Sequence, residues 1–169
     1  MLFINMRTIK FLPFFFLIFL SCESTPSLVS FFVRDGVIQY FLSPTNWNAS
    51  GSKAKLDITY RTGEDTPAIV NISFYDTRTT PRSVNADSVS LCGAGVDCPL
   101  VYDFIIFADP EKNELRVSFT ADRNRLVELL EAEPITLTAE VDGTVYVYTP
   151  EMYFNDLKNK FLIANSILM

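Results

Sequence analysis

The side chains that could do chemistry in this chain are few in kind: three cysteines, 20 acidic residues and no histidine. Without histidine, Ser-His-Asp and Cys-His nucleophilic pairs and every histidine-ligated metal site are excluded. A pair of catalytic carboxylates stays open, because such a pair is defined by its separation in space. We therefore predict no catalytic residue, no metal site and no cofactor, with a small hydrolase that uses paired carboxylates as the alternative.

Two of the cysteines, Cys92 and Cys98, enclose a short segment with two glycines. The spacing differs from the C-x-x-C of redox enzymes, and no second pair is present to complete a zinc site. In an exported protein, which the N-terminus indicates below, a disulfide within this loop is the natural interpretation. Two free thiols are the alternative.

One binding feature stands out, the lone tryptophan Trp47 between Asn46 and Asn48. The surrounding segment 44–51 has the composition of a loop, and a tryptophan there offers a large apolar face with one N–H donor. These three residues are our candidate ligand contacts. The simpler alternative is that Trp47 folds back as a plug over the open end of the domain.

The first 22 residues have the order of an exported leader, with Arg7 and Lys10 before the apolar run 11–20 and the pair Ser21-Cys22 after it. Ten residues of helix span about 15 Å, too short for a hydrocarbon core of about 30 Å. The order of charge, apolar segment and small residue is that of a secretory signal peptide.

The segment Phe19-Leu20-Ser21-Cys22 resembles the lipobox of bacterial lipoproteins, in the loosened form of spirochaetes and some Bacteroidota. The resemblance implies that Cys22 is diacylated, for example with palmitate, and becomes the N-terminus of a lipoprotein of the cell envelope. It would sit in the outer membrane, on a periplasmic leaflet or on the cell surface. The predicted organisation is a signal peptide (1–21), a lipidated tether (22–27) and one domain (28–169).

The charge of the processed chain restricts its partners. Cleavage before Cys22 removes two basic residues and leaves 12 basic against 20 acidic ones, a net charge of −8. Phosphate contacts need clustered lysine and arginine, so nucleic acid is not an expected partner. Direct adhesion to anionic headgroups is disfavoured for the same reason, and contact with a membrane is expected through the lipid.

Hydrophobic residues alternate with a period of two along most of the chain. The segment 53–61 is the clearest case, with one apolar face and one polar face that includes Asp57, typical of antiparallel sheets. Helical spacing follows in 121–133 and again after Thr149-Pro150-Glu151. The fold class is therefore mainly β: an immunoglobulin-like antiparallel β-sandwich with two short helices, one at the C-terminus. The expected strands are 28–34, 37–42, 53–61, 67–75, 87–91, 100–107, 114–120, 135–141 and 144–149.

The predicted function is that of a non-enzymatic binding or structural module of the envelope. Its expected partners are the membrane, through the lipid, and another envelope or host protein or a glycan at the loops of the fold. A carbohydrate-binding module is the alternative within this class. Tyr75, Tyr146 and Tyr148 are expected to pair across strands or to rim the sheet.

Overall fold

The structure, a computed structural model, describes residues 28–34, 36–62, 65–76, 81 and 83–166. The predicted signal peptide, the tether and Cys22 lie outside the described residues. Within the described ranges, no helix combines the length and the apolar character needed to cross a membrane.

The chain forms strands up to the C-terminal helix, with one short helix inserted before the last hairpin. The elements are β1 (Leu28–Arg34), β2 (Val37–Ala49), β3 (Ser52–Arg61), β4 (Ala68–Asp76), β5 (Val84–Gly93), β6 (Val96–Pro99), β7 (Val101–Asp109), β8 (Glu114–Ala121), α1 (Arg123–Glu131), β9 (Ile135–Val141), β10 (Thr144–Pro150) and α2 (Met152–Ser166).

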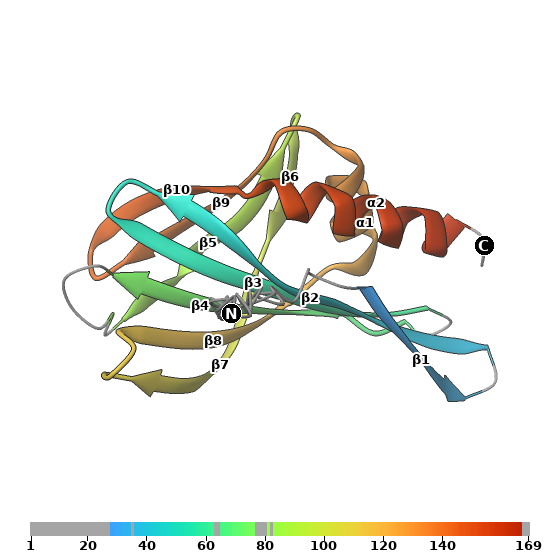
Figure 1. Cartoon of the computed structure of the whole chain (residues 1–169), viewed down its shortest axis with the longest axis horizontal. Helices are drawn as coiled ribbons and strands as arrows, with labels where there is room; N and C mark the ends of the chain where they lie inside the picture. The colour runs from blue at the N-terminus through green and yellow to red at the C-terminus, as the bar shows by residue number, and fades with distance from the viewer. Residues whose placement is uncertain (1–27, 35, 63–64, 77–80, 82, 167–169) are drawn as a thin grey trace, which may run out of the picture.

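The strands form one antiparallel sheet in the order β6-β5-β9-β10-β2-β3-β4-β8-β7, and β1 pairs with the first half of β2. The sheet curls, so that β5, β9 and β10 lie above β4, β8 and β7 with the two helices at one end (Figure 1). Its two terminal strands are joined through Leu100, whose N–H donates to the carbonyl oxygen of Val89. The core fills the space inside this curl.

The two-residue period of the sequence becomes the two faces of the sheet. In β3, the side chains of Ala54, Leu56 and Ile58 are at most 2% exposed and face the core.

The hairpin turn between β9 and β10 is built on Asp142 and Gly143, which have φ of 49° and 77°. A positive φ at both central residues is typical of a type I′ turn, whose twist matches that of the paired strands, and glycine adopts a positive φ without strain. The turn lies between the strands expected at 135–141 and 144–149, which the structure forms as β9 and β10.

Strand β2 does not end where we expected. Its pairing with β3 shifts by one residue between Leu42 and Thr45, a β-bulge that contains Pro44. A proline, which has no N–H to donate, is tolerated at a bulge. The extra residue reverses which side chains face inward, so Thr45 and Trp47 point into the core after it. The segment predicted as a loop is therefore the second half of a strand.

Aromatic rings fix α2 against the inner face of β2 and β3. Phe154 meets Trp47 edge to face with ring centroids 4.8 Å apart. About two helical turns further along α2, Phe161 meets Tyr40 and Tyr60 in the same edge-to-face way, with ring centroids 5.6 and 5.0 Å apart. All five rings are at most 5% exposed. This contact sets the position of the β10–α2 junction, which matters for the site below.

The prediction of a mainly β protein with two helices, one of them C-terminal, is confirmed. The immunoglobulin-like sandwich is not, because the strands follow one continuous curled sheet. Asp122 caps α1 by accepting a hydrogen bond from the backbone N–H of Arg125. Helix α2 begins at Met152, two residues after Pro150, which does not start it. That proline instead completes β10 by pairing with Trp47.

Candidate functional site

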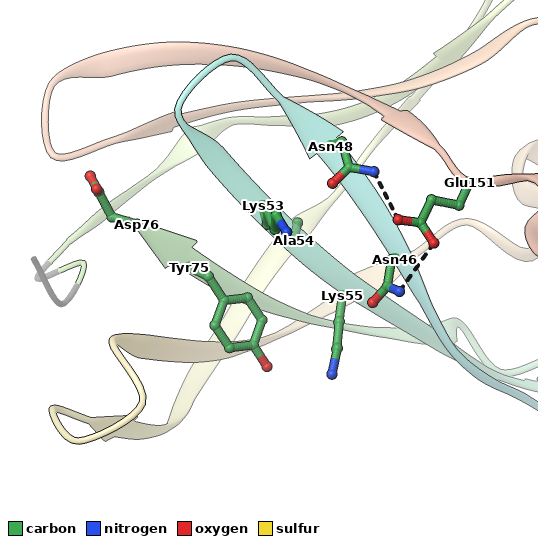
Figure 2. A pocket seen from close by; sticks show the side chains of 8 residues that line it. All are labelled: Asn46, Asn48, Lys53, Ala54, Lys55, Tyr75, Asp76 and Glu151. Carbon is green, nitrogen blue, oxygen red and sulfur yellow. Dashed lines mark hydrogen bonds between the residues drawn. The ribbon is translucent and has the colours of Figure 1, made fainter. Parts of the chain in front are cut away.

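A hollow of about 390 Å³ lies on the outer face of the sheet, where β2, β3 and β4 run side by side (Figure 2). Two cross-strand rows form its floor. Asn48 pairs with Lys53, which pairs with Tyr75, and next to them Asn46 pairs with Lys55. Residues in register on one face of a sheet are direct neighbours. The complete lining is Asn46, Asn48, Lys53, Ala54, Lys55, Tyr75, Asp76 and Glu151.

Glu151 closes one side of the hollow and holds both asparagines. Its carboxylate accepts hydrogen bonds from the Nδ2 atoms of Asn48, at 3.0 Å, and Asn46, at 3.1 Å. Its backbone N–H donates to the carbonyl oxygen of Asn46 at 3.0 Å. The hydrogen bond from the Asn48 side-chain amide lowers the pKa of Glu151 most, followed by the hydrogen bond from Asn46, and the charge of nearby Lys53 lowers it further. The carboxylate is therefore ionised at neutral pH and acts as a fixed acceptor.

Tyr75 supplies the aromatic surface of the hollow. Its ring is half-buried, and the Lys55 ammonium lies 5.8 Å from the ring centroid, within reach of a cation–π contact. Burial, followed by a hydrogen bond to Glu114, raises the pKa of Tyr75 to about 12. The phenol is therefore neutral at physiological pH.

The charges of the lining balance, with Lys53 and Lys55 against Asp76 and Glu151. A balanced lining gives no net attraction to a strongly anionic or cationic ligand. Each asparagine amide that holds Glu151 has a second N–H and a carbonyl oxygen by its chemistry. The hollow therefore combines one ring face with hydrogen-bonding groups of both kinds.

The structure separates the three predicted contact residues. Asn46 and Asn48 line the hollow, but Trp47 between them is 0% exposed and faces the core. Its indole N–H donates to the Oγ1 atom of Thr45 at 3.1 Å. The prediction that Trp47 contacts a ligand is therefore wrong, and its burial agrees with the alternative that the residue packs inward.

The predicted disulfide is also wrong, because Cys92 and Cys98 are both free thiols. In the β5–β6 hairpin, Cys92 pairs with Asp97 and Cys98 pairs with Leu91. The two cysteines therefore occupy adjacent rungs, and side chains on adjacent rungs point to opposite faces. Burial raises the pKa of the Cys98 thiol to about 11, and burial and Asp97 raise that of Cys92. Neither is activated as a nucleophile.

A second hollow of about 350 Å³ lies beside this hairpin and includes Cys92 and Thr136 in its wall. It lacks an aromatic surface, and its cysteine is protonated. In the described part of the chain, no group of three cysteine, aspartate or glutamate side chains is placed to hold a metal ion. The hollow beside Glu151 is therefore the stronger candidate site.

The sequence did not point to four members of the site, which are Tyr75, Lys53, Lys55 and Glu151. The sequence pattern did predict the polar face of the segment 53–61, and that face carries both lysines. Glu151 is 96 residues or more from the β3 lysines in sequence, and only the pairing of β10 with the end of β2 brings it there. No local pattern predicts that pairing.

The chain matches no protein-family model. No curated protein and no solved structure is similar to it at a significant level.

Proposed function

We propose that this protein is a non-enzymatic binding module of a bacterial cell envelope that binds a neutral carbohydrate in the hollow beside Glu151. The observation that carries the proposal is the combination of the Tyr75 ring with two asparagine amides and a carboxylate around a space of about 390 Å³. Small-molecule sites have volumes of roughly 300–1,000 Å³. A sugar presents one apolar ring face and many hydroxyl groups, and this lining offers a partner to each.

Electrostatics favours binding over hydrolysis at this site. A glycosidase needs one carboxylic acid that stays protonated near neutral pH, which requires a raised pKa. The pKa of Glu151 is lowered instead, because Asn48 and Asn46 donate to its carboxylate. The same hydrogen bonds hold both amides in fixed positions, which reduces the entropy lost on binding. Glu151 is therefore suited to accept a hydrogen bond from a sugar hydroxyl group, and it is not suited to donate a proton as a general acid.

Titration with a panel of neutral mono- and oligosaccharides by calorimetry tests the proposal. Tyr75→Ala is expected to weaken binding of the best sugar about tenfold, equivalent to about 1.4 kcal/mol. Tyr75→Phe keeps the ring and is expected to retain most of the affinity. Binding is expected to weaken only as the pH falls through the lowered pKa of Glu151, because the ionised form is the acceptor.

Tyr153→Ala is the matched control, because Tyr153 is 44% exposed on α2 and is not among the lining residues. Equal losses in Tyr75→Ala and Tyr153→Ala would contradict the assignment of the site. Turnover of a glycoside that Glu151→Gln abolishes would contradict the non-enzymatic role.

The envelope location rests on the sequence around Cys22, and the anchor has its own test. Wild-type protein expressed in a bacterium that processes lipoproteins is expected to enter the detergent phase in a Triton X-114 partition. Cys22→Ser removes the thiol that would carry the acyl chains, so unprocessed precursor is expected to accumulate. If both proteins are processed to the same mass, the lipoprotein proposal fails while the proposal for the hollow still stands.

A further inference from the structure

Strand β7 has more exposed hydrophobic side chains than any other strand whose side chains the structure describes. Twelve large hydrophobic side chains are exposed in the described residues, and six of them lie on β7, at 39–64% exposure. In the order of the sheet, β7 follows β8, which follows the strand β4 that carries Tyr75. The pairing of β7 with β8 therefore decides which of its side chains share a face with the hollow.

One cross-strand row leads from the hollow to β7. Lys55 of the lining pairs with Ser73 of β4. Ser73 pairs with Arg116 of β8, which pairs with Phe107 of β7. Paired residues lie on one face of a sheet, so Phe107, which is 40% exposed, stands on the same outer face as the hollow. Phe104 shares this face but pairs one step farther from the hollow.

Hydrogen bonds fix the middle of this row. Arg116 donates to the Oγ atom of Ser73 at 2.9 Å and forms an ion pair with Asp57. A guanidinium has five N–H groups, so Arg116 can hold both partners and still donate to a hydroxyl group of a ligand. Asp57 balances the charge of Arg116, so the row favours a neutral ligand, as the hollow does.

A ligand longer than the hollow has room to continue in this direction. Glu151 closes the hollow on the side of β2, and Tyr75 lies on the side away from it (Figure 2). From Lys55 to Phe107 the row crosses three strand spacings, about 14 Å in all. One strand spacing, about 4.8 Å, is close to the length that one residue adds to an extended sugar chain.

We propose that the hollow is one end of a longer site, which binds an extended neutral oligosaccharide across β3, β4, β8 and β7 with Phe107 as a second aromatic platform. The inference rests on the proposed binding of carbohydrate beside Glu151. One sugar ring lies on Tyr75, the chain passes over Arg116, and a later ring lies on Phe107. The second contact tightens binding because the first has already brought the chain to the surface.

Calorimetry with β-1,4-linked cello-, manno- and N-acetylated chito-oligosaccharides of increasing length tests the proposal. The affinity of the wild type is expected to rise about tenfold from the disaccharide to the longest member of the series that binds best. Phe107→Ala is expected to remove this gain and to leave the affinity for the disaccharide unchanged, which also shows that the variant is folded. Phe107→Tyr keeps a ring and is expected to keep the gain.

Ile105→Ala is the matched control. Ile105 is 51% exposed on the same strand, but it pairs with the core residue Val117 and so belongs to the other face. This variant is expected to bind every member of the series like the wild type.

Two sets of results would contradict different claims. An affinity that does not depend on chain length, or equal losses in Phe107→Ala and Ile105→Ala, would overturn the longer site. The hollow would stand as a site for short sugars if Tyr75→Ala still weakened binding of the disaccharide. If no sugar of these series bound, or if Tyr75→Ala bound them like the wild type, both the hollow and its extension would be overturned.

Discussion

Replacing Trp47 with Ala is expected to lower the free energy of unfolding by about 3–5 kcal/mol. The indole is 0% exposed, and its edge-to-face contact with Phe154 joins α2 to the sheet. Truncation removes that contact and opens a cavity that the surrounding strands cannot close. It also leaves Thr45 without the indole N–H that its hydroxyl accepts. Urea denaturation followed by circular dichroism measures the loss.

Two control variants separate packing from binding. Trp47→Phe keeps an aromatic ring against Phe154 and is expected to lose less stability than the alanine variant. Asn48→Ala removes a neighbour of Glu151 on the outer face and is expected to affect sugar binding more than unfolding. A Trp47→Ala protein as stable as the wild type would mean that the bulge in β2 does not turn this side chain inward.

Replacing Asp57 with Ala is expected to destabilise the protein by about 3 kcal/mol. Asp57 belongs to the polar face of β3, where we expected solvent, yet it is 2% exposed. Arg116 from β8 forms an ion pair with its carboxylate, and the Nδ2 atom of Asn71 donates to it at 2.9 Å. Removing the carboxylate leaves the guanidinium, whose side chain is only 21% exposed, without its counter-ion.

The double variant Asp57→Ala with Arg116→Met tests this cause directly. Replacing both members of a buried ion pair with apolar groups is often close to neutral. The double variant is therefore expected to recover much of the stability that the single variant loses, in the same denaturation experiment. A single variant as stable as one at the exposed Lys53 would show that the pair contributes little.

The strands could be predicted because their signal is local. The alternation in 53–61 and in the expected strand 67–75 gave β3 and β4 nearly to the residue, since burial of one face is written directly in the order of side chains. The curl of the sheet could not be predicted in this way. It depends on which strands pair across long separations, such as β5 with β9 and β10 with β2.

The bulge in β2 explains the largest local error. Pro44 and the asparagines have the composition of a loop, and proline interrupts a ladder in most strands. Here the proline sits where the ladder already skips a residue. The same bulge determines that Trp47 faces the core while Asn46 and Asn48 face the hollow. One inserted residue thus decides which side chains are available to a ligand.

The cysteine error has a similar origin. The spacing of Cys92 and Cys98 permits a closed loop, but the segment folds as a tight hairpin on Ala94 and Gly95, with φ of 42° and 87°. Once the turn is two residues long, pairing fixes the cysteines on adjacent rungs. Only the turn type, which the sequence Gly93-Ala94-Gly95 leaves open, distinguishes the two outcomes.

The most direct test of the proposed function is an NMR titration of ¹⁵N-labelled protein with the sugar that binds best in calorimetry. We expect the side-chain amide signals of Asn46 and Asn48 and the backbone signals around Tyr75 and Glu151 to shift together with one dissociation constant. The indole N–H signal of Trp47 is expected to stay nearly unchanged, because it lies on the core side of β2. Shifts that gather elsewhere on the molecule, or no shift with any sugar of the panel, would contradict the assignment of this hollow as a carbohydrate site.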